Sequence, residues 1–409
     1  MQKPSIVPVL LGLDQYAYSM AISFYEAFGV TSHAFGRYTC GITEHSRFIK
    51  THKEPNMTDP AVGVPALIAF AEAHRGALLL LVPCADWYMA LAEGARERLG
   101  VYYRFFLPPR PLFRAVSDKA SFYRLLEKHG LPYPRTLAFS ALSELKIKEK
   151  DFSVSFPAVL KASDSTEYYR HPFDGMRKVY FPKNREELHA TSAKIFASGY
   201  KGELIFQEKI GKTRAEAKTL TICADSDSVV RRAVLGTVLL EETAPGARGN
   251  YAAILTEPPD DLTRSLCGFV RTVGYTGIGN FDLLYDEYGR GYVLEMNPRQ
   301  GRSCDYVRAA GISLAEFLYA EISGGYVGEQ FRYPRIYWRA VGDTTVARYA
   351  ENRELLARAM RLKEDGFAFS PFFYAEDLRR NPVRRVYVGI HTWRRGNAFA
   401  GAKAGAATV

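Results

Sequence analysis

Cysteine is sparse in this chain, and its cysteines stand far apart. Five cysteines occur among 409 residues, without the close pairs that zinc sites and redox motifs use. This spacing fits free thiols in a reducing compartment and argues against a disulfide framework. Long apolar runs are also missing, and a run such as residues 76–83 is far too short to span a bilayer. The N-terminal residues carry no cleavable signal pattern, so a cytoplasmic location is expected.

The composition is that of a folded chain in which basic residues outnumber acidic ones. Hydrophobic residues make up 47% and charged residues 24%, which argues against a disordered chain. A chain of this length is expected to form two or three packed units. The formal net charge of +10 favours anionic partners. No nucleic-acid-binding module is recognisable, so nucleotides and other small anions are favoured; a basic surface with no specific partner is the alternative.

Strands alternate with helices in the first part of the chain. Residues 5–13 and 77–82 are short apolar runs, and each precedes a segment with helical spacing of apolar side chains, at 15–28 and 86–99. This alternation predicts a parallel α/β sheet within residues 1–112.

After a proline-rich linker at residues 108–111, the predicted strands and helices no longer alternate regularly. This region is therefore predicted to be α+β. Strands are expected at 156–161, 179–182, 203–207, 219–224, 229–240, 279–285 and 291–296, and helices at 118–129, 186–199 and 262–273.

A pair of carboxylates within apolar strands carries the strongest chemical signal. Alternate residues of a strand share a face, so Glu295 and Asn297 point the same way. A hairpin around the turn at 286–290 would place Asp282 beside Glu295. Two carboxylates and an amide oxygen suit Mg²⁺. Solvated residues on a strand edge are the alternative, but carboxylates in apolar strands cost several kcal/mol unless they are paired or bind a metal.

Two lysines lie upstream at structural junctions. Lys119 opens a helix, and Lys161 ends an apolar strand, where an ammonium group needs an anion. The segment 162–178 that follows is either a lid that closes over phosphates, with Lys178 contacting them, or an ordinary charged hairpin. His171 in this segment is a candidate general base, although a solvated histidine is favoured.

Together these residues resemble the ATP-grasp superfamily. Its members carry two lysines and then an Asp … Glu-x-Asn metal set, and the spacing here is similar to that of the D-alanine–D-alanine ligase branch. The segment 297–303, Asn-Pro-Arg-Gln-Gly-Arg-Ser, looks like the corresponding segment of the D-aspartate ligases of peptidoglycan crossbridge synthesis. Further similar segments lie at 10–14, 86–88, 118–123 and 131–136, and the resemblance extends to about residue 330.

The resemblance implies an ATP-grasp fold with an N-terminal parallel α/β domain. The N-terminal domain would cover residues 1–112 and the ATP-grasp domain residues 113–330. Within the latter, a small lid subdomain would cover about 113–206 and a metal-bearing subdomain about 207–330. Residues 331–409 would form a C-terminal extension with a basic tail.

The resemblance also implies ATP and Mg²⁺ as cofactors, with Mn²⁺ as an alternative ion. The residues expected to bind ATP are Lys119, Lys161, Lys178, Lys218, Gln207, Glu208 and Ile210, of which the last three would form the adenine hinge. The metal ligands would be Asp282, Glu295 and Asn297. The groups expected to neutralise the transferring phosphoryl group or the amino-acid carboxylate are Arg299, Arg302 and Ser303, together with Lys161. Lys218 stands where the family usually carries an arginine.

The implied reaction joins the β-carboxylate of D-aspartate to the lysine ε-amine of a UDP-MurNAc-pentapeptide precursor. It would pass through an acyl phosphate and release ADP and phosphate. The alternatives are a ligase for another acid or amine, a kinase or synthetase of a small metabolite, and a nucleotide-binding regulator without catalysis. The complete metal set argues against the regulator.

Arginine pairs mark the C-terminal tail, at 379–380, 384–385 and 394–395, with Tyr387 and Trp393 between them. Such a segment could rest on an anionic membrane. A solvated basic tail is the favoured interpretation.

Overall fold

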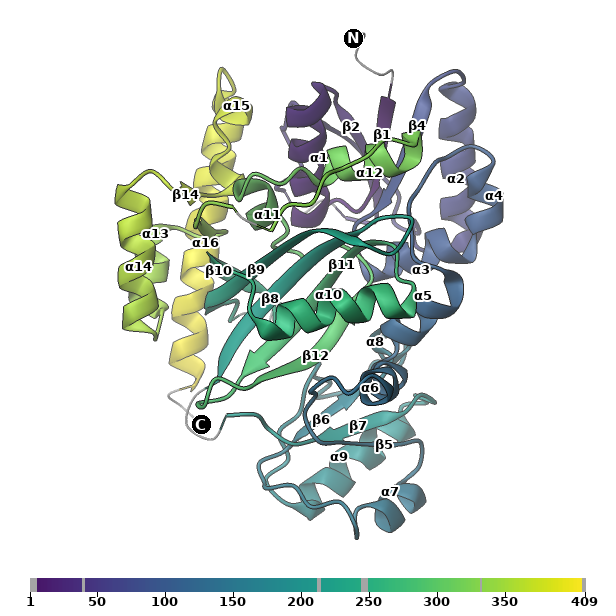
Figure 1. The fold of residues 1–409 in the computed structure, drawn as a ribbon, viewed down its shortest axis with the longest axis vertical. Coiled ribbons are helices and arrows are strands. Elements are labelled where there is room, and N and C mark those ends of the chain that lie inside the picture. Colours follow the sequence, from purple (N-terminus) through teal and green to yellow (C-terminus); the bar gives the residue numbers. More distant parts are fainter. Residues whose placement is uncertain (1–5, 39–40, 212–214, 244–248, 332, 407–409) are drawn as a thin grey trace.

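A computed structural model describes residues 6–38, 41–211, 215–243, 249–331 and 333–406. Residue 5, included in the first predicted strand, lies outside these ranges. Figure 1 shows a parallel sheet at the top, a small sheet at the bottom and a larger twisted sheet between them. No helix in these ranges is long and apolar enough to cross a bilayer.

The N-terminal sheet is parallel, in the order β3-β2-β1-β4, as the alternating pattern predicted. Its strands are β1 (Ile6–Leu11), β2 (Ser32–Gly36), β3 (Ile49–Lys53) and β4 (Leu78–Pro83). Its helices are α1 (Gln15–Phe28), α2 (Pro60–Ala73), α3 (Asp86–Gly94) and α4 (Arg96–Gly100). The Asp14 side chain caps α1, and Gly29 ends it with a φ of 67°. The helix predicted at 86–99 is interrupted at Ala95.

A small antiparallel sheet, β5-β7-β6, forms the lower lobe. Its strands are β5 (Thr136–Phe139), β6 (Val159–Ala162) and β7 (Leu204–Gln207). The helices of this region are α5 (Arg110–Ser117), α6 (Lys119–Lys128), α7 (Leu142–Lys148), α8 (Ser165–Tyr168) and α9 (Arg185–Ala197). The strand predicted at 179–182 is wrong, because Tyr180 makes only an isolated bridge to Leu160. The predicted linker at 108–111 runs directly into α5.

The central sheet has the order β12-β11-β8-β9-β10-β13-β14. Its strands are β8 (Glu216–Ala224), β9 (Val230–Glu241), β10 (Tyr251–Glu257), β11 (Gly277–Tyr285), β12 (Gly291–Asn297), β13 (Tyr337–Arg339) and β14 (Ala368–Phe369). Helix α10 (Asp261–Val273) crosses one face (Figure 1). The sequence did not predict β10, β13 or β14, and the last two bring residues of the C-terminal segment into this sheet.

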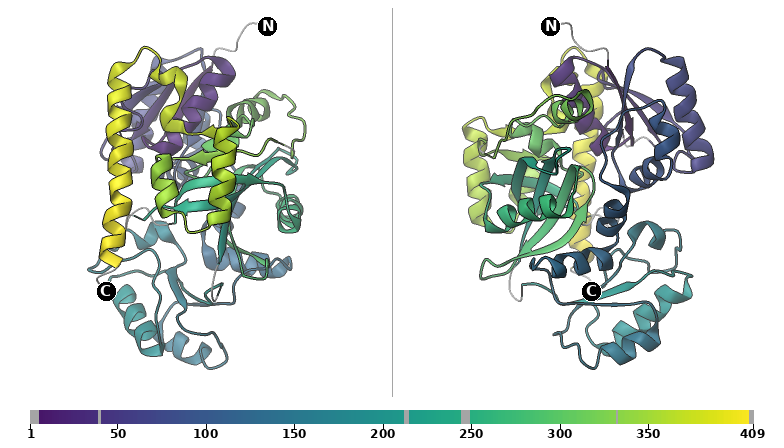
Figure 2. Two further views of the ribbon diagram at one scale, coloured as in Figure 1. Left: turned by 90° about the vertical axis from the view of Figure 1, so that its left-hand side faces the viewer. Right: turned by 45° about the vertical axis from the view of Figure 1, so that its right-hand side comes forward.

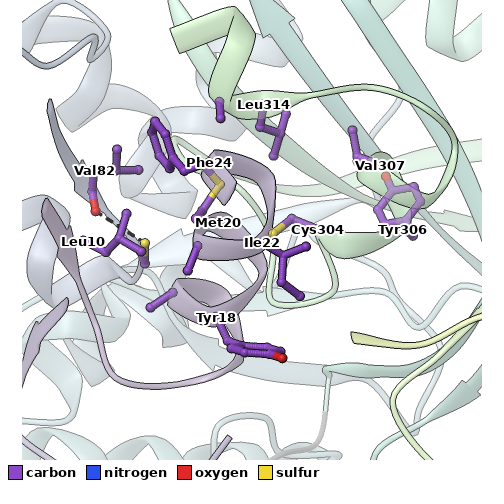
Figure 3. Close-up of a cluster of buried hydrophobic side chains, with 14 of the residues drawn as sticks. Leu10, Tyr18, Met20, Ile22, Phe24, Val82, Cys304, Tyr306, Val307 and Leu314 are labelled. Atoms are coloured by element: carbon purple, nitrogen blue, oxygen red, sulfur yellow. Dashed lines mark hydrogen bonds between the residues drawn. The ribbon is translucent and has the colours of Figure 1, made fainter. Parts of the chain in front are cut away.

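One apolar core joins the N-terminal sheet to the central region. Figure 3 shows α1 in this core, with Met20 and Phe24 near Leu10 of β1. On the other side are α11 (Asp305–Ala309) and α12 (Leu314–Ser323), which contribute Tyr306 and Leu314. Burying these side chains together fixes the carboxyl ends of β1 and β4 relative to the central sheet.

The C-terminal segment is folded, not a solvated tail. Its helices are α13 (Asp343–Tyr349), α14 (Arg353–Glu364), η1 (Pro371–Phe373), α15 (Ala375–Leu378) and α16 (Pro382–Ala406). Helix α16 runs along the outer edge of the molecule (Figure 2, left). On its inner face, Arg384 is fully buried and Val388 is 2% exposed. The favoured prediction of a solvated tail was therefore wrong, because the basic residues share the helix with an inward apolar face.

Candidate active site

The predicted hairpin is confirmed. Strands β11 and β12 are antiparallel, and Asp282 lies opposite Glu295 while Asn280 lies opposite Asn297. Asn280 is held in place by Thr219 of β8, whose hydroxyl donates to Asn280 Oδ1 at 3.0 Å. Alternation along the two strands therefore collects two carboxylates and two amides on one face of the central sheet.

The two carboxylates form a partly buried pair of like charge. Burial and the charge of Glu295 raise the pKa of Asp282 above its usual value. Tyr251 Oη of β10 donates to Asp282 Oδ1 at 3.0 Å. Burial would raise the pKa of Glu295 too, but nearby lysines hold it below its usual range. Such a pair, with an amide oxygen alongside, fits a hard divalent cation, since the cation offsets the repulsion that burial strengthens.

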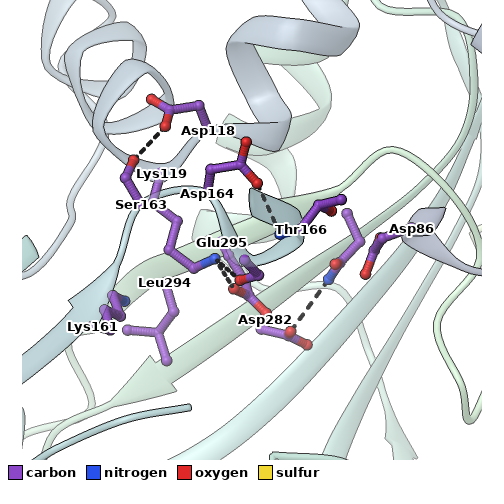
Figure 4. A network of polar contacts seen from close by, with 12 residues as sticks. Asp86, Asp118, Lys119, Lys161, Ser163, Asp164, Thr166, Asp282, Leu294 and Glu295 are labelled. Carbon is purple, nitrogen blue, oxygen red and sulfur yellow. Dashed lines mark hydrogen bonds and ion pairs between the residues drawn. The ribbon is translucent and has the colours of Figure 1, made fainter. Parts of the chain in front are cut away.

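Lysines from separate segments surround the carboxylate pair. Lys119 Nζ, in the first turn of α6, lies 3.2 Å from Glu295 Oε2 (Figure 4). Lys161, on β6, donates to Tyr123 Oη at 3.0 Å. Lys178 follows α8, and the carboxylate of Glu295 raises its pKa. The three lysines outnumber the two carboxylates of the pair, so the cluster favours further anions.

Three adjoining cavities meet at this cluster. The hinge cavity, of about 710 Å³, opens beside the end of β7 and is lined by Gln207, Glu208 and Ile210. The lysine cavity, of about 180 Å³, holds the side chains of Lys119, Lys161, Lys178, Asp282 and Glu295. The arginine cavity, of about 640 Å³, is lined by Asn297, Arg299, Arg302 and Ser303. The lysine cavity shares lining residues with both neighbours, so it lies between the hinge cavity and the arginine cavity.

The hinge residues use their side chains to hold the lower lobe together. Gln207 Nε2 donates to Thr136 Oγ1 at 2.7 Å. Glu208 Oε1 accepts from the backbone N–H of Arg135 at 2.7 Å. This arrangement is consistent with the prediction that backbone groups of the hinge, rather than its side chains, read a base.

The arginine cavity contains two guanidinium groups. That of Arg299 is held by an ion pair, whereas Arg302 has a nitrogen without a hydrogen-bond partner among the described residues. Arg299 Nε and Nη2 donate to the two oxygens of Asp86, each at 2.7 Å. Burial would lower the pKa of Arg299, but Asp86 raises it above its usual value. Among the described residues, Arg302 Nε is buried without a hydrogen-bond partner. Gln15 Nε2 holds the backbone of Arg302 by donating to its carbonyl oxygen at 3.2 Å, and Ser303 is buried beside it.

Comparison with known proteins identifies the fold and a relative. No protein-family model matches the chain. The D-aspartate ligase of Enterococcus faecium is 29% identical over 388 residues, covering 91% of each chain. The biotin carboxylase domain of Hydrogenobacter thermophilus 2-oxoglutarate carboxylase, solved with MgADP, ADP and bicarbonate, has a TM-score of 0.62 at 18% identity and covers 81% of this chain and 73% of its own. The L-amino acid ligase of Bacillus licheniformis has a TM-score of 0.56 at 15% identity, covering 81% and 78%.

The chain is an ATP-grasp carboxylate–amine ligase. The structural likenesses show its fold, and the sequence relative aligned over nearly the whole chain indicates the enzyme class. An N5-carboxyaminoimidazole ribonucleotide synthetase, solved as an ADP complex, has a TM-score of 0.62 at 12% identity and covers 89% of this chain and 88% of its own.

One predicted ATP ligand lies elsewhere. Lys218 belongs to β8, and its neighbour Ala217 lines the hinge and lysine cavities. Since side chains alternate along a strand, Lys218 points to the opposite face of the sheet. There its ammonium group lies 4.2 Å from the ring centroid of Tyr285 and 3.9 Å from Asp260 Oδ2. This placement contradicts the predicted contact of Lys218 with ATP.

The segment 162–178 brings Lys178, but not its histidine, to the ligase site. It contains the short helix α8, which Asp164 caps. His171 Nε2 lies 2.9 Å from Glu167 Oε1, and His171 lines none of the three cavities. His171 is therefore not placed to act as the general base, and whether the segment closes as a lid stays a prediction.

Three residues of the site were missed as functional residues. Asp86 follows the carboxyl end of β4, where ligands of parallel sheets gather, and it lies in the similar segment 86–88, but it was assigned no role. Tyr123 Oη donates a hydrogen bond to the carbonyl of Leu294 at 2.6 Å and accepts one from Lys161 Nζ. The role of Tyr123 becomes visible only once α6 is packed against β12. Tyr251 was missed because the strand that carries it was not predicted.

Proposed function

We propose that this ligase joins the β-carboxylate of D-aspartate to the ε-amine of a peptide lysine, using ATP. The amine would belong to a UDP-linked peptidoglycan precursor, UDP-MurNAc-pentapeptide, and the products would include ADP and phosphate. The choice of D-aspartate is supported by the Enterococcus faecium relative. The observation that carries the reaction type is the lysine cavity, which places the Asp282–Glu295 pair between the hinge cavity and the arginine cavity.

The three cavities suit three parts of the reaction. A base in the hinge cavity would contact the apolar side chains of Leu239 and Leu284. The phosphates would then reach the lysine cavity, where Lys161 and Lys178 offset their charge. The acid would lie in the arginine cavity, within reach of the γ-phosphate. Holding the two reactants in adjoining cavities lowers the entropic part of the barrier.

Phosphoryl transfer is the chemical reason for this arrangement. A carboxylate is a poor electrophile, whereas an acyl phosphate is open to attack by an amine. Asp282, Glu295 and Asn297 would hold Mg²⁺, which neutralises phosphate charge when bound. Arg302 Nε, buried without a partner among the described residues, provides a donor for the charge that develops on the acid or on the transferring group.

The arginine cavity offers the guanidinium of Arg302 to the carboxylate of an acid. Its own carboxylates are already engaged, since Asp86 pairs with Arg299 and Asp118 caps α6. The cavity therefore accounts for an acid, and the choice of an amino acid follows from the Enterococcus faecium relative.

The experiment is phosphate release from MgATP, with single amino acids added alone and together with a UDP-linked lysine-containing precursor. We expect turnover with D-aspartate plus precursor, and little with L-aspartate or D-glutamate. Mass spectrometry should find a product heavier by one aspartyl residue. Turnover with another acid or amine would keep the ligase class and discard D-aspartate. Absence of ATP turnover with every pairing would contradict the acyl-phosphate mechanism.

Lys161 gives a pH-dependent prediction for nucleotide binding. Burial lowers its pKa to about 8, so in the free ligase it becomes neutral as pH rises through this value. A bound phosphate favours the charged form, so binding above about pH 8 must take up a proton. MgATP affinity is therefore expected to weaken above this pH, by up to about tenfold per pH unit. Titration calorimetry from neutral to alkaline pH measures this slope.

Lys161→Arg is the control for this titration, because arginine stays charged throughout the range. Its MgATP affinity should not follow the Lys161 titration. An equal slope in this variant would contradict the assignment of the pH dependence to Lys161.

A further inference from the structure

Helix α16 exposes a continuous apolar stripe to solvent. Val383, Val386, Ile390 and Trp393 are 56%, 64%, 47% and 67% exposed. Their spacing of three or four residues puts them on one side of the helix. Because α16 lies along the outer edge of the molecule, this side faces away from the three sheets (Figure 2, left). Single exposed apolar residues are common, but a stripe along one helix marks an interaction site.

The stripe is held in a fixed orientation by the inner face of α16. Arg384 Nη1 donates to the carbonyl of Glu44 at 2.8 Å, and its guanidinium lies 4.8 Å from the ring centroid of Tyr18. Val388 is buried in the core shared with α1, and Phe399 is buried against the central sheet. The exposed side of α16 is therefore presented by a docked helix and not by a frayed end.

Arginines flank the stripe on both sides. Arg385 and Arg394 are exposed, and at 100° per residue they fall on opposite edges of the apolar side. Residues 379–399 contain six arginines and no aspartate or glutamate. The exposed face of α16 therefore combines aliphatic side chains, a tryptophan and arginines, with no acidic side chain among residues 379–399.

We propose that this face of α16 docks flat on an anionic lipid bilayer. Amphipathic helices of this composition lie in the membrane interface, with apolar side chains among the acyl chains and arginines at the headgroups. Tryptophan favours the same interface because its ring is apolar and its N–H is polar. The helix is a straight ridge, a shape that a flat bilayer can accept without a groove.

Charge argues against a second copy of the chain as the occupant. A two-fold dimer through this face would place Arg385 and Arg394 of one copy near the same arginines of the other. Such like charges repel unless a carboxylate intervenes, and residues 379–399 supply none. The phosphates of an anionic bilayer provide the compensating charge.

The test is co-sedimentation of the full chain with vesicles of phosphatidylcholine alone or mixed with phosphatidylglycerol. We expect binding only to the mixed vesicles, with affinity that falls as salt is raised. Ile390→Asn/Trp393→Asn should lower the partition coefficient about tenfold or more. Arg385→Gln/Arg394→Gln should lower it about fivefold per arginine. Trp393 fluorescence should shift to the blue on binding, because the indole leaves water.

Val101→Asn/Tyr288→Asn is the matched control, since both side chains are exposed apolar groups on other elements. It should bind vesicles as the unmodified chain does. The thermal midpoint should be the same in all variants, which shows that α16 stays docked. Failure of the unmodified chain to bind the mixed vesicles at low salt would overturn the proposal, and so would unchanged binding by Ile390→Asn/Trp393→Asn. A dimer in light scattering that this double variant abolishes, without vesicle binding, would assign the face to a second copy.

Discussion

Glu295→Gln is expected to lower kcat/KM for ATP-dependent phosphate release by about 10³-fold. The substitution removes one carboxylate of the proposed metal set and the partner of Lys119, whose Nζ lies 3.2 Å away. Without this charge, the lysine cavity keeps Lys161 and Lys178 but loses a carboxylate whose charge raises the pKa of both. The assay is phosphate release with the substrates that give turnover in the unmodified ligase. The Mg²⁺ concentration for half-maximal activity should rise in the variant.

Glu287→Gln is the matched control, because Glu287 is an exposed carboxylate in the turn of the same hairpin. Its activity and Mg²⁺ dependence should equal those of the unmodified ligase. A folded Glu295→Gln protein is recognised by its unchanged circular dichroism, and MgATP should no longer raise its thermal midpoint. Activity within about tenfold of the unmodified ligase would contradict the metal-binding role.

Arg384→Met is expected to lower the free energy of unfolding by about 3–5 kcal/mol. Arg384 is fully buried, and its Nε lies 3.4 Å from Oδ2 of Asp377, which is also buried. Asp377 accepts hydrogen bonds from Tyr18 Oη at 2.6 Å and from the backbone N–H of Arg47 at 2.9 Å. Methionine fills similar space but leaves Asp377 as a buried charge without its cation. Urea unfolding measures the loss, and limited proteolysis should cut near residue 380.

Two further variants separate charge from packing at this position. Arg384→Met/Asp377→Asn removes both charges and should recover much of the lost stability. Arg379→Met breaks only the exposed contact with Glu376, 3.8 Å long, and should change stability by no more than about 0.5 kcal/mol. If Arg384→Met were no less stable than Arg379→Met, the buried pair would not be what holds α16 in place.

The hairpin of β11 and β12 is the part of the site that could be predicted from sequence. Its two strands are neighbours in the chain, and a short turn limits how they can pair. Once paired, alternation decides which side chains share a face, so Asp282, Glu295 and Asn297 had to come together. The order of the two lysines and this triad then matched a known family.

The predictions that failed depended on contacts between distant segments. Lys218 was placed by resemblance, but the pairing of β8 with β11 puts Ala217 on the side of the hinge and lysine cavities. The ion pair of Asp86 with Arg299 joins residues that are 213 positions apart. No local pattern reports such a pair, because it forms only when the N-terminal sheet packs on the central region.

The sequence by itself determined the alternating strands and helices of the N-terminal sheet, the hairpin and the side chains proposed there as metal ligands. These follow from local periodicity, turn residues and strand alternation, which act over a few neighbouring residues. Tertiary structure decided that Lys178 approaches Glu295, that Lys218 faces away, and that α16 is a docked helix with an exposed apolar stripe. Each of these depends on how whole elements pack, since burying one face of an element selects which side chains remain for a ligand or for solvent.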